Sequence, residues 1–165
     1  MNAPAPMALV RLMQLVSPAL PVGAYTYSQG LEWAVESGRI RNETSAGEWI
    51  GDLMQHCIGR FEAPLVAALM QHWASGNTKE IARLNADFLA SRESAELRTE
   101  TAQMGFSLNR LLNDLGVPVL TTLRTQLAGL PEIAFPTVWS GLAAAWRIEP
   151  YDAVCGYLWA WAENQ

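Results

Sequence analysis

The sequence predicts an all-α protein, and three observations support this fold class. Apolar residues recur at helical spacing along most of the chain, and no stretch combines alternating polarity with the β-branched content of a strand. Capping residues and helix-ending glycines separate these segments. Half of the 165 residues are apolar and 16% are charged, which is typical of a globular protein with a core. We therefore expect a single helical domain over residues 1–165, with about seven to nine helices.

The first two predicted helices lie on either side of a turn. Residues 7–16 are too continuously apolar for a surface helix, and Ser17-Pro18 ends this segment. A second helix is expected to begin near Ser28 and to end at Ser37, with Gly38 just beyond its last turn.

A capping box predicts the next helix. Ser45 and Glu48 have the spacing at which each side chain bonds the other residue's backbone N–H, and the helix should end at about Gly59. Its apolar stripe, at four-residue spacing, consists of Trp49, Leu53 and Cys57. Cys57 is thus expected to pack as a small apolar residue.

The remaining helices follow from the same kinds of signal. Their expected ranges are 64–76, 77–90, a longer helix capped by Ser91 or Ser94 and ending at residue 115, then 119–127, 137–145 and 151 onward. The last of these reaches Gln165 without a Gly, a Pro or a basic last turn, so we expect the sequence to stop within an element.

Composition excludes several classes of partner and location. The net charge of −5 argues against binding to nucleic acid or to an anionic membrane, because both need a basic patch. Cys57 and Cys155 lie far apart and outside any CxxC motif, which favours the reducing cytoplasm over a disulfide framework. The start has no basic region and Arg11 interrupts its apolar stretch, so no secretion signal is expected.

Catalytic motifs are absent from the sequence. It contains no phosphate loop, dinucleotide-binding, HExxH or GxSxG pattern, so no catalytic residue is predicted. No metal site is predicted either, because the usual ligand spacings are missing. His56 and His72 fall on different predicted helices. A partial site that joins them to each other or to an acidic residue stays open, as does nickel bound by one histidine from each chain of a dimer.

An apolar, aromatic turn is the most informative segment. Residues 17–36 read SPALPVGAYTYSQGLEWAVE, and residues 12–31 carry no charged side chain. Prolines and glycines interrupt this run, so it is not a membrane span. An apolar loop usually packs against its own core or against a partner. The seven tryptophans raise the same alternatives, core or protein interface.

The charged segment 91–100, SRESAELRTE, is the second informative feature. If it is helical throughout, Arg92 can pair with Glu96, while Glu93 and Glu96 crowd Glu100 on one side. Three interpretations are open. The segment is a solvated face with ion pairs, a docking face for a basic partner, or a pair of carboxylates for acid–base chemistry.

Two motifs, in this order, resemble the UreF family of urease accessory proteins. The first is the run in residues 15–34, and the second is SRExxELR in residues 91–98, followed by Met104-Gly105. The turn at Glu62-Ala63-Pro64 also fits, although the family often has Asp in place of Glu62. The resemblance covers essentially the whole chain. The family continues with a Pro-Leu-Gly-Gln-type motif and further helices that this sequence lacks.

This resemblance implies a non-enzymatic, all-helical, cytoplasmic and homodimeric protein. Such a protein binds the accessory protein UreD (also called UreH) and recruits the GTPase UreG. The assembly docks on apo-urease and supports delivery of nickel, and UreF gates GTP hydrolysis by UreG. No intrinsic cofactor is implied, because the assembled complex handles the nickel.

The resemblance also suggests which residues contact partners. One docking surface is expected to include Tyr25, Tyr27, Gln29 and Glu32. The same surface or a second one is expected to include Arg92, Glu93, Glu96 and Arg98. Glu32 and Glu96 are the leading candidates for contacting UreG. Arg92 and Glu93 are alternatively internal ion-pair partners. Gly23 and Gly30 are expected to serve backbone geometry or close approach.

Two other functions stay open at this point. One is a small all-α metal- or cofactor-binding protein with His56, His72 and the acidic segment as ligands. The other is a helical adaptor unrelated to urease.

Overall fold

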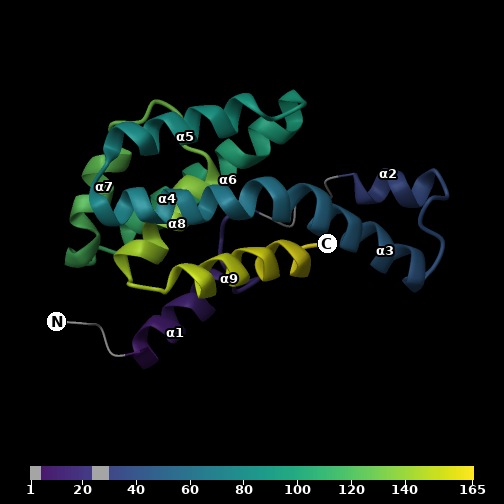
Figure 1. The fold of residues 1–165 in the computed structure, drawn as a ribbon, viewed down its shortest axis with the longest axis horizontal. Coiled ribbons are helices and arrows are strands. Elements are labelled where there is room, and N and C mark those ends of the chain that lie inside the picture. Colours follow the sequence, from purple (N-terminus) through teal and green to yellow (C-terminus); the bar gives the residue numbers. More distant parts are fainter. Residues whose placement is uncertain (1–4, 24–29) are drawn as a thin grey trace.

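The computed structural model describes residues 5–23 and 30–165, and all regular structure within these ranges is helical (Figure 1). The predicted all-α fold class is therefore confirmed. In chain order the elements are α1 (Ala5–Leu15), α2 (Leu31–Glu36), α3 (Glu43–Leu53), the π-helix η2 (Met54–Glu62), α4 (Ala63–Ser75), α5 (Thr78–Ala90), α6 (Ala95–Asp114), the 3-10 helix η3 (Pro118–Leu120), α7 (Thr121–Leu127), α8 (Phe135–Ala145) and α9 (Pro150–Glu163).

Helix α8 is the centre of the fold. Its sequence, FPTVWSGLAAA, has no charged residue, and all of residues 136–143 are buried. A helix that is apolar on every side must be surrounded by other elements, and α8 packs most extensively against α4 and α6. Trp139 is completely buried and meets Tyr157 of α9 edge to face, with ring centroids 5.4 Å apart. Helices α1, α7 and α9 add further side chains to this main core.

A buried asparagine fixes the loop that leads into α8. The Asn85 side-chain amide on α5 donates to the Glu132 carbonyl at 2.8 Å. Its Oδ1 accepts from the Ala134 backbone N–H at 2.9 Å and from the Thr137 hydroxyl at 2.8 Å. An unpaired amide at this depth would destabilise the fold. These bonds therefore position the second, smaller core cluster between α4 and α5, which includes Ala134.

Helices α2 and α3 form an arm, residues 31–53, that extends away from this body (Figure 1). Helix α3 has no buried residue and contacts chiefly its own continuation, η2. The arm is negative on balance, because its exposed Arg39 and Arg41 are outnumbered by five exposed acidic residues, namely Glu32, Glu36, Glu43, Glu48 and Asp52.

Several helix ends agree with the prediction because their signals are local. Asn77 caps α5 by accepting from the Glu80 N–H at 3.3 Å, and Ser94 caps α6 by accepting from the Leu97 N–H at 3.2 Å. Gly76 ends α4 with a left-handed φ of 68°. Gly38 follows α2 with φ 72°.

The start of the arm differs from the prediction. Helix α2 begins at Leu31, and Gly30 precedes it with φ 91°; Ser28, where a start was expected, lies outside the described residues. Helix α3 is capped by Asn42, whose Oδ1 accepts from the Ser45 N–H at 2.9 Å. The predicted box of Ser45 with Glu48 is therefore wrong, because Ser45 already occupies the third position of the helix.

The helix also does not end at Gly59. It continues through η2 into α4, and the π-helical register turns Cys57 to solvent while Ile58 is buried. The prediction that Cys57 packs against the core is therefore wrong. The tryptophans divide between both interpretations: Trp139 is in the core, whereas Trp33 and Trp159 are exposed.

No helix in the described part of the chain is long and apolar enough to cross a membrane.

Gly105 offers a test of this packing. A Cβ at this position would overlap the carbonyl oxygen of Ile133, because α6 crosses the loop before α8 at this point. We expect Gly105→Ala to lower the free energy of unfolding by about 2 kcal/mol, since overpacking a fitted site shifts backbone atoms. Urea denaturation measures this change. Gly51→Ala on α3 is the control, because an added methyl group there meets no atom within 4 Å outside the backbone of its own helix; an equal loss in both variants would contradict the packing.

Candidate functional site

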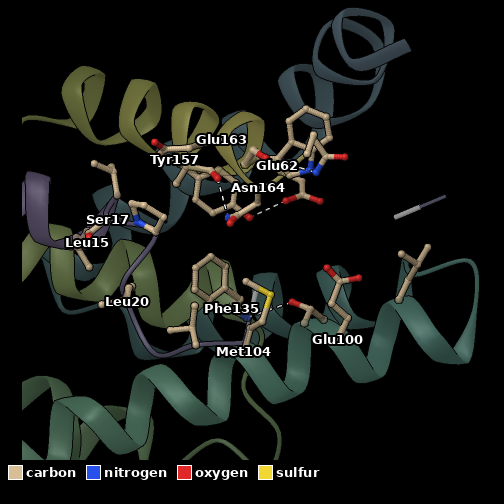
Figure 2. A pocket seen from close by; sticks show the side chains of 18 of the residues that line it. Leu15, Ser17, Leu20, Glu62, Glu100, Met104, Phe135, Tyr157, Glu163 and Asn164 are labelled. Carbon is tan, nitrogen blue, oxygen red and sulfur yellow. Dashed lines mark hydrogen bonds between the residues drawn. The ribbon is translucent and has the colours of Figure 1, made fainter. Parts of the chain in front are cut away.

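A buried polar cluster of Glu62, Arg92 and Tyr157 joins three parts of the chain. Arg92 Nη1 donates to Glu62 Oε1 at 3.0 Å. The Tyr157 hydroxyl donates to Glu62 Oε2 at 2.6 Å. Figure 2 shows Tyr157 on α9 directed toward Glu62. The cluster thus ties the end of η2 to the turn between α5 and α6 and to the last helix.

Aromatic rings surround the arginine of this cluster. The Arg92 guanidinium lies 4.1 Å from the Phe88 ring centroid and 5.6 Å from that of Phe61. These two rings stack with centroids 5.9 Å apart and planes 6° apart. Only 17% of the Arg92 side chain and 10% of the Glu62 side chain are exposed. The cation is therefore stabilised by a carboxylate and by ring faces, rather than by water.

The cluster keeps its tyrosine protonated. Burial raises the pKa of the Tyr157 hydroxyl well above its usual range, and the charge of Glu62 raises it further. A neutral hydroxyl can donate to a carboxylate, whereas a phenolate cannot. The arrangement is therefore a structural brace in which both carboxylate oxygens of Glu62 accept a hydrogen bond, while the buried Nε of Arg92 has no partner among the described residues.

The cluster borders a cavity of about 90 Å³ between α6 and α9 (Figure 2). Apolar side chains such as Leu20, Met104 and Phe135 form much of its lining, and Glu100 of α6 also faces it. Glu100 is buried. The volume is well below the roughly 300 Å³ at which small-molecule pockets begin. The cavity has the size for a side chain rather than for a metabolite.

The first predicted docking surface is only partly described. Tyr25, Tyr27 and Gln29 lie outside the described residues. Glu32 is exposed on α2. Gly23 and Gly30 have φ of 79° and 91°, a backbone conformation that strains any L side chain.

The structure separates the residues of the second predicted surface. Arg92 lies in the turn before α6 and pairs with Glu62, so its predicted helical pairing with Glu96 is wrong. Glu93 is exposed in that turn. Arg98 pairs with Glu132 at 2.6 Å on the surface. Their roles in partner binding stay predictions.

Only part of the acidic segment is available to a partner. Glu96 is exposed in the first turn of α6, whereas Glu100 is buried. The predicted crowding of Glu93, Glu96 and Glu100 on one helix face is therefore wrong, since Ser94, not Ser91, caps the helix. The pKa of the Glu96 carboxyl is lowered because it accepts hydrogen bonds from its own backbone N–H and from the Ser94 hydroxyl. Glu96 therefore stays negatively charged.

Tyr157 was not predicted from the sequence as a member of this cluster. Its signal was present, because Ala153, Gly156 and Tyr157 have the spacing of one buried helix face. A tyrosine on such a face needs a partner for its hydroxyl. The partner, Glu62, could not be identified without the fold.

Helices α1 and α9 share an exposed apolar surface, the α1–α9 face. Its exposed members are Leu9, Met13 and Trp159. Between the two helices runs a groove of about 750 Å³, bordered by Arg147, Glu149 and Asp152. Trp159 is 61% exposed. Large aromatic residues at such exposure are typical of protein interfaces.

Metal ligands do not gather within residues 5–23 and 30–165. No three His, Cys, Asp or Glu side chains there lie close enough together to hold an ion. His56 is exposed on η2, and His72 is half-buried on α4.

The fold and these surfaces define an all-helical protein with exposed surfaces suited to docking. The UreF family model matches residues 40–165. The chain is 68% identical to the urease accessory protein UreF of Dechloromonas aromatica (strain RCB), over 95% of this chain and 69% of that protein. It is 60% identical to UreF of Azoarcus sp. (strain BH72), over 95% of this chain and 68% of that protein. The urease accessory protein UreF of Methylobacillus flagellatus is 46% identical, over 96% of this chain and 69% of that protein. The chain belongs to the UreF family of urease accessory proteins.

The role of Glu62 in the buried cluster can be tested by measuring the free energy of unfolding. We expect Glu62→Ala to lower the free energy of unfolding by about 3 kcal/mol, because it leaves the Arg92 charge buried without its carboxylate. Chemical denaturation measures the loss. Asp87→Ala removes one partner of the exposed Arg83–Asp87 pair and serves as the control, with an expected change of at most about 0.5 kcal/mol. Similar losses in both variants would show that the cluster is not a brace.

Proposed function

We propose that this chain is a scaffold and regulator in urease maturation. It binds UreD, recruits the GTPase UreG, and gates GTP hydrolysis while nickel passes to apo-urease. The observation that carries the proposal is membership of the UreF family, with a relative 68% identical across 95% of the chain. Nickel is cargo of the assembled complex in this proposal and not a cofactor of the chain.

The exposed surfaces are consistent with docking. The arm presents Glu32 to solvent, and the start of α6 presents Glu96 with its charge retained. Complementary charge steers partners together and selects among them, so these acidic positions suit a partner with basic residues. Cys57 and Cys155 are both free thiols, which fits the proposed location in the reducing cytoplasm.

Coexpression with UreD tests the proposal. Affinity capture followed by size-exclusion chromatography should show that the chain and UreD elute together. Coelution supports the UreF role and assigns the contact to these 165 residues. If a folded, helical chain does not retain UreD, the capture is repeated with the full-length relative from Dechloromonas aromatica, whose failure as well would overturn the proposed partner.

Recruitment of UreG provides a residue-level test. We expect Glu32→Ala and Glu96→Ala each to weaken UreG capture by about tenfold, the effect of losing about 1.4 kcal/mol. Circular dichroism should show unchanged helical content. Glu36→Ala on α2 and Asp114→Ala at the end of α6 are the matched controls, since both residues are exposed acids on the same helices. Full UreG retention by both test variants would remove Glu32 and Glu96 from the interface.

The proposed homodimer has a candidate interface in the α1–α9 face. This face combines the exposed Trp159 with both signs of charge, Arg147 against Glu149 and Asp152. A two-fold dimer needs a surface that is complementary to itself. Apolar area with opposite charges on its border meets this requirement.

Light scattering tests this interface. The wild-type chain should have the mass of a dimer, and Trp159→Glu should reduce it to the mass of a monomer, because a carboxylate cannot be buried there without a partner. Trp33→Glu is the control, as Trp33 is similarly exposed but lies on the arm. A dimer that survives Trp159→Glu would place the interface elsewhere.

A further inference from the structure

One continuous helical rod, residues 43–75, changes its hydrogen-bond pattern in the middle. Helices α3 and α4 are α-helical, whereas η2 between them is a π-helix. Both residues that flank η2 keep right-handed helical dihedrals, so the rod is not interrupted, and the Ala63 N–H bonds the Ile58 carbonyl five residues back. π-helical segments are rare, mostly a single turn long, and frequent at functional sites.

Gly59 is the residue that permits this geometry. A Cβ at Gly59 would lie 2.7 Å from the carbonyl oxygen of Met54, which is five residues earlier. In a regular α-helix alanine is preferred to glycine. Glycine is not required at Gly47 or Gly51 of α3, since a Cβ at either position meets no atom within 4 Å outside the backbone of its own helix. The requirement for glycine therefore arises at position 59 from the π-helical register.

The body holds the C-terminal end of η2 in this register. Glu62, the last residue of η2, bonds Arg92 and Tyr157. Phe61 stacks on Phe88 of α5. Ile58 is buried in the main core.

Helix α3, the part of the arm next to η2, has no comparable attachment to the described residues of the body, whereas Ala34 of α2 is buried. Helix α3 buries no side chain, and its contacts are chiefly with η2. The direction of the arm therefore depends on the register of η2. A change of register by one residue turns everything beyond it by about 100° around the helix axis.

We propose that η2 is a two-state joint that sets the direction of the arm. In the π state the arm lies as in Figure 1. In the α state the arm is turned about the rod axis. The α-helical geometry is the commoner one for the backbone, and the contacts of Ile58, Phe61 and Glu62 with the body select the π state. The joint does not depend on the proposed function, although Glu32, which that function assigns to docking, lies on the arm.

Distances between two spin labels test the joint. Labels are placed at Glu48→Cys on α3 and Arg110→Cys on α6, both exposed positions, with Cys57 and Cys155 replaced by serine. Gly59→Ala should move the main peak of the distance distribution, whereas Gly51→Ala should leave it unchanged. Identical distributions in the wild type, Gly59→Ala and Gly51→Ala would overturn the proposal.

A second variant tests the two-state joint if Gly59→Ala alone does not fold. Deletion of the exposed Gln55 removes one residue from η2, so that the segment can close as an α-helix with the arm in its original direction. Gly59→Ala combined with this deletion should fold and restore the wild-type distance. A combined variant that is unfolded, or that gives a displaced peak, would contradict the joint.

The polar cluster gives an independent readout of the same proposal. Tyr157→Phe removes one hydrogen bond to Glu62 and should increase the population at the displaced distance. An unchanged distribution would show that Glu62 does not hold the register.

Discussion

The ion pair between Glu62 and Arg92, completed by the Tyr157 hydroxyl, is the interaction on which the arrangement of this chain most depends. It is the point where the helical rod, the turn between α5 and α6, and the last helix meet. Burying both charges is unfavourable by itself, and their attraction compensates only when the geometry satisfies the remaining donors and acceptors. Here the phenol bonds the second oxygen of Glu62 and the faces of Phe61 and Phe88 contact the guanidinium, whereas Arg92 Nε has no hydrogen-bond partner among the described residues. The cluster therefore specifies which three segments come together more than it adds net stability.

The rest of the fold divides into a packed body and an arm. The body is organised around α8, whose side chains are buried on all sides, and Asn85 fixes the loop that enters it. The arm leaves this body through η2 and buries nothing along α3. This combination suits the proposed docking role, because surfaces that bind partners must be exposed while their positions are defined. The buried cluster lies at the boundary between the two parts.

Local sequence signals predicted much of the fold and little of the site. The caps at Asn77 and Ser94 were correct because a cap depends on residues within one helical turn. Gly59 was interpreted as a helix end because a π-helical segment has no established sequence signal and glycine is typical of helix ends. The pairing of Arg92 was wrong because its partner is thirty residues away in the chain. The docking prediction for Tyr25, Tyr27 and Gln29 stays untested, since these residues lie outside the described ranges.

A double-mutant cycle between Glu62 and Arg92 measures whether these two residues stabilise the fold as a unit. The free energy of unfolding is measured for the wild type, Glu62→Ala, Arg92→Leu and the double variant. If the two residues form the brace, the summed losses of the two single variants should exceed the loss of the double variant by more than about 1 kcal/mol. The reason is that each single variant leaves the other charge buried alone. Losses that add within about 0.3 kcal/mol would mean that the residues act independently, and the account would be wrong.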